Sequence, residues 1–215
     1  MAGCTGVAVK PPATLPVLAP LVTANAAHYT INAEHSEIRF LVYRAGPLAA
    51  FGHNHVIRAA TIRGEVYLNP KFMLSGFAFT LPVKDFRVDE PAERAAEGSD
   101  FDSQPSAAAI AGTTHNMLGP ALLDAVHYPE INVRSVQIAG SQTSANVILR
   151  IGLRGAQRDV TVPVTLAISD GQLAASGKFQ IRQTDFGIVP FSILGGGLQV
   201  ADTVKVHFRI VAERD

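Results

Sequence analysis

Cysteine, tryptophan and charge are scarce in this chain. Cys4 is the single cysteine among 215 residues, and tryptophan does not occur. One cysteine excludes an internal disulfide framework. Charged residues make up only 17%, and 18 basic residues balance 18 acidic ones without a run of five like charges. This balance lacks the positive surface that binding to a phosphate backbone requires, so we do not expect nucleic acid as a partner.

The N-terminal segment has no long uninterrupted apolar run. Residues 1–27 carry one charge, Lys10, and four prolines lie between Pro11 and Pro20. Prolines at this density would break a membrane-spanning helix of about 20 residues. A complete signal peptide is missing as well, because no charged region precedes an apolar core. We therefore expect residues 1–27 to be a flexible Pro/Ala-rich leader in front of a single domain over residues 28–215.

Cys4 adds a further hypothesis about this leader. The start Met1-Ala2-Gly3-Cys4 resembles the end of a bacterial lipoprotein signal, in which the cysteine receives a lipid. A spacer behind such an anchor would tether the domain to a membrane and place it in the bacterial cell envelope, in the periplasm. The alternative is a leader with an incidental thiol.

Apolar residues are abundant, at 47%, and they alternate with polar ones. This period of two predicts β-strands that are apolar on one face only. The alternation covers residues 36–44, 61–69, 76–86, 145–155, 159–168, 171–182 and 202–212. Many short antiparallel strands leave two architectures, a sandwich or a closed barrel, and a barrel has the advantage that it removes edge strands.

Two stretches depart from the alternation. Residues 104–127 are rich in Ala and Leu with helical spacing, which predicts one or two short helices inserted between strands. The spacing of Glu90, Glu93 and Glu97 also suits one helical face, which we expect to lie in solvent.

Several motifs, in order along residues 28–213, resemble the YceI-like proteins, a family named for polyisoprenoid binding. The first motif contains Tyr29, Ile31, Asn32, His35, Ser36 and Phe40; the second contains Tyr128, Pro129, Ile131 and Ser135; the third contains Leu153, Gly155, Arg158, Val160 and Pro163; the last is IRQTDFGI. The chain departs from the family at FGHNHVI, residues 51–57, where Gly-x-Phe is usual.

The resemblance implies an all-β, lipocalin-like antiparallel β-barrel of about eight strands with a short helical insertion. Such a barrel would hold an isoprenoid quinone or another amphiphilic isoprenoid lipid, for transport or storage. The apolar wall would then be formed by Phe40, Val42, Phe77, Phe79, Leu149, Ile151, Phe179 and Ile181. Periodicity alone leaves open whether these side chains surround a hollow interior or fill a closed core. In the second case, the chain would be a ligand-free structural or interaction domain. The sequence also leaves a homodimer open.

His53 and His55 admit three interpretations. On an extended strand both imidazoles point to one side and could meet a metal ion, with His115 as the candidate third ligand. They could instead contact the polar head group of a lipid at the mouth of the barrel. The third interpretation is a polar turn at the rim. No nucleophile signature such as G-x-S-x-G occurs, so we do not expect an enzyme.

Overall fold

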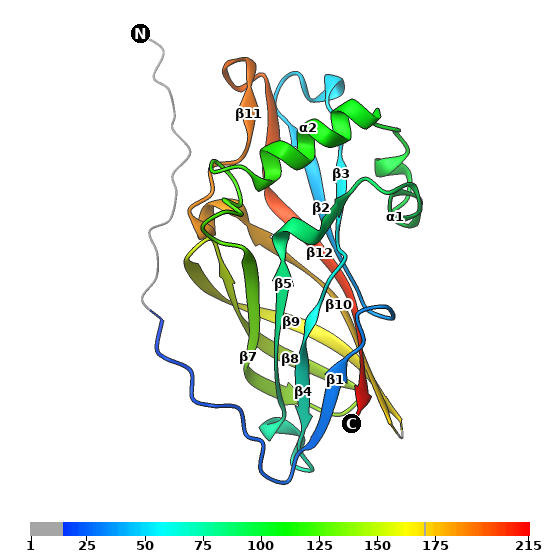
Figure 1. Ribbon diagram of the computed structural model, residues 1–215, viewed down its shortest axis with the longest axis vertical. Coiled ribbons are helices and arrows are strands. Elements are labelled where there is room, and N and C mark those ends of the chain that lie inside the picture. The colour runs from blue at the N-terminus through cyan, green and yellow to red at the C-terminus, as the bar shows by residue number, and fades with distance from the viewer. Residues whose placement is uncertain (1–14, 170) are drawn as a thin grey trace.

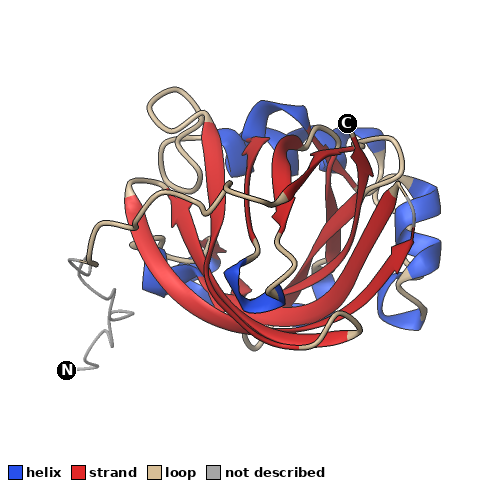
Figure 2. Ribbon diagram, turned by 90° about the horizontal axis from the view of Figure 1, so that it is seen from below, coloured by secondary structure: helices blue, strands red, loops and turns tan. Residues whose placement is uncertain are grey.

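The computed structural model describes residues 15–169 and 171–215, and its strands close into one barrel. Eight strands follow one another in the order β1-β4-β5-β7-β8-β9-β10-β12, and β12 pairs back to β1. All of these pairs are antiparallel. Figure 2 shows the strands curving around a single interior. The predicted all-β, lipocalin-like barrel is therefore confirmed.

The barrel strands are short in the first half of the chain and longer in the second. They are β1 (Ala27–Ile31), β4 (Arg63–Leu68), β5 (Gly76–Pro82), β7 (Glu130–Gly140), β8 (Ser144–Leu153), β9 (Ala156–Ser169), β10 (Gln172–Arg182) and β12 (Leu198–Arg214). The remaining elements are β2 (Glu37–Ala45), β3 (His55–Ala59), β6 (Phe86–Val88), β11 (Ser192–Ile193), α1 (Pro91–Ala96) and α2 (Ala107–Leu118).

The strands β2, β3 and β6 extend the wall of the barrel at one end. The last residues of β12 pair with β1, whereas the part of β12 before them pairs with β2, and β3 and β6 follow outward. Helix α2 crosses this end of the molecule, which is the upper end in Figure 1. The barrel therefore has a helix-covered end and, opposite it, the end at the β4–β5 connection.

Alternation along the strands directs one set of side chains into the barrel. Ile38 on β2, Leu149 on β8 and Ile210 on β12 belong to this buried interior. The outer face of β2 is covered too, because Leu41 packs with Val56 and Phe101 in a second, smaller cluster.

The predicted helical insertion over residues 104–127 contains α2 and then a series of turns. Helix α2 begins behind Ser106, whose hydroxyl accepts a hydrogen bond of 3.2 Å from the Ala109 N–H and so caps the helix. We expected helical structure to continue toward Tyr128, but residues 119–128 turn instead. Asp124 has a left-handed φ of 49°, which a continuing helix does not allow. Within the described residues, no helix is long and apolar enough to cross a membrane.

The described part of the leader, residues 15–26, runs along the outside of the barrel beside β7 (Figure 1). Arg150 donates a hydrogen bond to the carbonyl of Pro16, and Arg134 donates one to the carbonyl of Ala19. Strand β1 begins at Ala27, one residue before the expected start of the domain. Cys4 lies outside the described residues.

Candidate functional site

Two cavities adjoin each other inside the barrel. Cavity 1 has a volume of about 140 Å³ and lies toward the β4–β5 connection, and cavity 2, of about 210 Å³, lies beneath α2. Phe40, Ile131, Leu153 and Ile181 line both cavities, so only side chains separate the two spaces. Each cavity is larger than a water molecule needs, and the largely apolar lining of cavity 1 offers water few hydrogen-bond partners.

All eight residues expected to form the apolar wall line these cavities. Cavity 1 is lined by Phe40, Phe77, Phe79, Leu149, Ile151, Phe179 and Ile181, and cavity 2 is lined by Phe40, Val42 and Ile181. The inward faces predicted from the alternation are therefore the inward faces of the barrel. The interior is hollow at these positions, which the periodicity could not decide.

The two cavities differ in their polar side chains. Ser75, beside the β4–β5 connection, is the polar side chain that lines cavity 1. Cavity 2 is lined by four polar side chains, those of His55, Thr113, Asn116 and Gln183. Among the described residues that line either cavity there is no Asp, Glu, Lys or Arg. The interior thus has an apolar half and a half with several hydrogen-bonding groups.

His55 is held in place at cavity 2 by a buried carboxylate. Its Nδ1 lies 2.6 Å from Oδ2 of Asp89, whose side chain is completely buried. The other carboxylate oxygen of Asp89 accepts hydrogen bonds from the Val56 N–H at 2.9 Å and from the Arg94 guanidinium at 2.5 Å. An ionised carboxylate only accepts hydrogen bonds, so Nδ1 of His55 carries the proton. Nε2 is then the ring nitrogen left for a ligand in cavity 2.

Asp89 is ionised in this arrangement. Burial would raise the pKa of its carboxyl group, but the hydrogen bonds from His55, Val56 and Arg94 outweigh burial and hold the pKa below its usual range. Its backbone φ of 55° is left-handed, a conformation that Asp tolerates better than most residues. This turn at the end of β6 brings the carboxylate under β3.

Arg94, which neutralises Asp89, is buried in helix α1. Its guanidinium donates to the carbonyls of Asn54 at 2.8 Å and Ser103 at 2.9 Å, and it lies 5.9 Å from the centre of the Phe101 ring. These contacts fix α1 and the loop before β3 to each other. The orientation of His55 therefore depends on where α1 sits.

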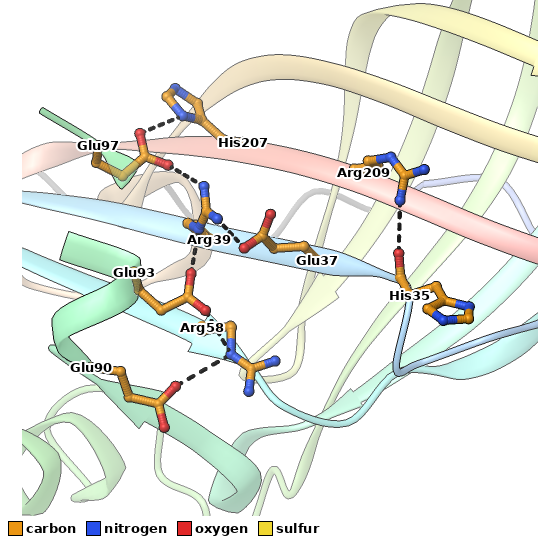
Figure 3. A network of polar contacts seen from close by, with 9 residues as sticks. All are labelled: His35, Glu37, Arg39, Arg58, Glu90, Glu93, Glu97, His207 and Arg209. Carbon is orange, nitrogen blue, oxygen red and sulfur yellow. Dashed lines mark hydrogen bonds and ion pairs between the residues drawn. The ribbon is translucent and has the colours of Figure 1, made fainter. Parts of the chain in front are cut away.

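Helix α1 and the residue that follows it, Glu97, are also bound to the barrel by a network of ion pairs (Figure 3). Arg39 on β2 pairs with Glu93 at 2.5 Å and with Glu97 at 3.0 Å. Arg58 on β3 lies 3.1 Å from Glu93, and His207 on β12 lies 2.8 Å from Glu97. The network joins α1 to three strands.

The expectation that Glu90, Glu93 and Glu97 face solvent is wrong for two of the three. The side chains of Glu93 and Glu97 are only 14% and 6% exposed, whereas that of Glu90 is 41% exposed. The spacing indicated the shared face correctly. It could not show that cationic side chains on the outside of β2, β3 and β12 would meet that face.

The three histidines considered as metal ligands do not come together. The rings of His53 and His55 are 6.4 Å apart at an interplanar angle of 76°, and Nδ1 of His55 is engaged by Asp89. His115 is exposed on α2, where its neighbour Asn116 lines cavity 2. Among the described residues, no group of three or more His, Cys, Asp or Glu side chains is placed to hold a metal ion. Of the two histidines expected at a head group, His55 lines cavity 2, whereas His53 is exposed and is not among the residues that line it.

Sequence reasoning missed most of the polar groups around cavity 2. Asp89 and Arg94 lie 34 and 39 residues after His55, and Gln183 lies 128 residues after it. An acidic residue and an arginine five positions apart, as in VDEPAER, are common in any sequence, so no local signal marks Asp89 and Arg94. Asn116 was the exception in part, because it lies beside His115, which was predicted from the sequence as a candidate metal ligand.

The chain is similar to one domain family and to several solved structures. The model of the YceI-like domain matches residues 29–212. Burkholderia cenocepacia BcnA has a TM-score of 0.61 at 18% identity, over 84% of this chain and 98% of that one. A polyisoprenoid binding domain from Saccharophagus degradans, implicated in plant cell wall breakdown, has a TM-score of 0.58 at 12% identity, over 87% and 98%. A YceI protein from Campylobacter jejuni has a TM-score of 0.54 at 10% identity, over 74% and 84%. At these identities the likeness concerns the fold. A search of curated protein sequences found no match.

Proposed function

Because this chain belongs to the YceI-like domain family, whose model matches residues 29–212, we propose that it binds an amphiphilic isoprenoid-type lipid inside its barrel. The observation that carries the proposal is the pair of adjoining cavities, with apolar walls along most of their length. Burial of an alkyl chain there would contribute about 0.8 kcal/mol per methylene group before ordering costs. The polyisoprenoid binding domain from Saccharophagus degradans has the same fold, which supports this class of ligand.

The difference between the two cavities gives the ligand a direction. The isoprenoid tail lies in cavity 1 and crosses the junction at Phe40 and Ile181. The polar head lies in cavity 2, where Nε2 of His55 and the side chains of Asn116 and Gln183 offer hydrogen bonds. His53, which is exposed and does not line cavity 2, is not needed for this contact.

The head group is uncharged in this proposal. A phosphate or diphosphate would lose its hydration in cavity 2 without an arginine or lysine to replace it, and a buried charge without a partner is strongly disfavoured. A carbonyl or hydroxyl oxygen needs only a hydrogen bond, which a histidine or an amide can supply. An isoprenoid quinone, phenol or alcohol therefore fits better than a polyprenyl phosphate.

The chain acts as a carrier or store of this lipid rather than as an enzyme. A buried Asp behind a His is also part of hydrolase triads, in which the His contacts a nucleophilic hydroxyl or thiol. Among the described residues, no hydrogen bond joins His55 to a Ser, Thr or Cys side chain. We place the protein in the periplasm of the bacterial cell envelope, with Cys4 as the site of a lipid anchor.

Substitution of Ile181 by Trp tests lipid binding at the junction of the cavities. The indole would fill the space that a tail has to cross, so we expect Ile181→Trp to lose the ligand while the barrel stays folded. The measurement is native mass spectrometry of protein that was exported to the envelope and never refolded. The unmodified chain should carry an excess mass of several hundred daltons that organic solvent removes.

Gln180→Trp is the matched control, because Gln180 is exposed on the outer face of the same strand. This variant should keep the excess mass. The proposal fails if the unmodified chain carries no extractable molecule, or if Ile181→Trp retains as much of it as Gln180→Trp. A single metal ion in place of the lipid would revive the metal-binding alternative.

A further inference from the structure

Two loops at the helix-covered end carry large apolar side chains into solvent. Leu48 and Phe51 on the β2–β3 loop are 38% and 81% exposed, and Ile193 and Leu194 at the β11–β12 turn are 43% and 72% exposed. We call these four residues the apolar tip. Figure 1 shows both loops side by side at the top of the molecule, beyond α2. Single exposed apolar residues are ordinary, but a cluster on two loops marks an interaction site.

The two loops form one unit because their backbones touch. The Leu48 N–H donates to the carbonyl of Gly197 at 2.8 Å. Gly46 has a φ of 89°, and a Cβ atom there would lie 2.7 Å from the same carbonyl, so only glycine fits. At the base, the Arg44 guanidinium donates to the carbonyl of Gly52 at 2.8 Å. The four apolar side chains are thus held out together.

The sequence of the tip is free of ionisable side chains apart from one histidine. Residues 45–53 and 188–200 contain no Asp, Glu, Lys or Arg, in a chain with 17% charged residues. Surface loops commonly contain charged residues. The absence of Asp, Glu, Lys and Arg from these two segments lowers the free-energy cost of moving the tip from water into an apolar medium. Only His53 in these two segments can become charged.

The tip stands at the rim of cavity 2. Phe191 and Val200 line the cavity, and the Val200 N–H donates to the Phe191 carbonyl at 2.9 Å, so the base of this hairpin is cavity wall while its turn carries Ile193 and Leu194. The other loop leads into β3, whose first residue, His55, lines the cavity four residues after Phe51. A ligand that left the barrel through cavity 2 beside the tip would pass into whatever surrounds the tip.

We propose that the apolar tip inserts into the surface of a phospholipid bilayer, at the place where the ligand enters and leaves cavity 2. This inference rests on the proposed function, because a ligand with an isoprenoid tail resides in membranes. A second copy of the chain is the less suitable partner. Stable protein interfaces bury about 800 Å² on each side, which four side chains on protruding loops do not supply. Shallow insertion of a few apolar side chains gives weak, reversible binding, which suits a carrier.

Vesicle flotation of the double variant Phe51→Ser/Leu194→Ser tests the insertion. The full chain is used with Cys4→Ser, so that no acyl anchor contributes, together with phosphatidylcholine vesicles. We expect the parent chain to float with the vesicles and the double variant to lose at least 10-fold in its partition coefficient. Met73→Ser/Leu74→Ser is the matched control, because these two apolar residues are 68% and 46% exposed at the other end of the barrel. The control should float like the parent.

Any of three flotation results would overturn the inference: no binding of the parent to vesicles, equal binding of parent and tip variant, or loss of binding only in the Met73/Leu74 control. A dimer of the parent that becomes monomeric in the tip variant, as seen by sedimentation velocity, would also overturn it.

Uptake of the isoprenoid alcohol geranylgeraniol from detergent solution, without vesicles, tests lipid binding separately. If the tip variant takes up this alcohol normally there but slowly from vesicles, the result supports the tip as the membrane contact. If neither the parent nor any variant takes up the alcohol, the proposed function fails. Vesicle flotation would still measure whether the tip binds the membrane.

Discussion

Among single residues, Asp89 combines complete burial, a negative charge and contact with the ligand-facing His55. We expect Asp89→Asn to lower the free energy of unfolding at neutral pH by about 3 kcal/mol, because Arg94 would be left buried without its counter-charge. The pKa of Asp89 is lowered in the folded protein, so its contribution to stability is complete above the ordinary Asp value of about 3.9 and is lost as the pH falls further.

Urea unfolding at a series of pH values measures this contribution. The parent chain should lose stability below pH 4 more steeply than Asp89→Asn, which has no carboxyl group left to protonate at this position. Asp102→Asn, a change at an exposed carboxylate, is the control and should follow the parent. Parallel curves for the parent and Asp89→Asn would contradict the role of Asp89.

Among the elements, α1 is a short helix whose position depends on ion pairs rather than on an apolar face. We expect Arg39→Ala to lower the free energy of unfolding by roughly 2 kcal/mol, because Glu93 and Glu97 would remain largely buried without their shared partner. Amide hydrogen exchange of residues 91–97 should accelerate more than that of the barrel strands.

Arg209→Ala provides the comparison, since Arg209 is exposed on the same face and donates one hydrogen bond to the His35 carbonyl (Figure 3). This control should change stability by less than about 0.5 kcal/mol. If both variants lose equal stability, or if exchange in α1 is unchanged in Arg39→Ala, the network does not hold the helix.

In the molecule as a whole, the hollow interior makes stability depend on the ligand. A ligand that binds only the folded state at 100 times its dissociation constant stabilises it by about 2.7 kcal/mol. We therefore expect solvent extraction to lower the midpoint of thermal unfolding by about 5–10 °C. Addition of geranylgeraniol to the extracted protein should restore it.

Ile181→Trp serves as the control, because its junction is filled and added isoprenoid should leave its midpoint unchanged. An extracted protein that unfolds at the same temperature as the loaded one would show that the cavities are not a ligand site.

Alternation along the strands by itself determined which side chains share one face of a strand. Side chains alternate between the two faces of a strand, so residues two positions apart lie on the same face. Phe77 and Phe79 therefore share one face of their strand, and Leu149 and Ile151 share one face of theirs. The seven predicted stretches correspond to β2, β4, β5, β8, β9, β10 and β12. They do not include two of the eight barrel strands, β1 and β7, or the short strands β3, β6 and β11. The family motifs, not the alternation, favoured a barrel over a sandwich.

Only the tertiary structure decided what surrounds each face and each polar group. The cavities exist because side chains from strands far apart in the sequence fail to meet at the centre, which no local pattern records. Glu93 and Glu97 are buried because Arg39 and His207 arrive from other strands. His55 is distinguished from His53 by Asp89, a residue 34 positions away that the chain brings to 2.6 Å. Local spacing fixes the direction of a side chain, but its partner depends on long-range pairing of the strands.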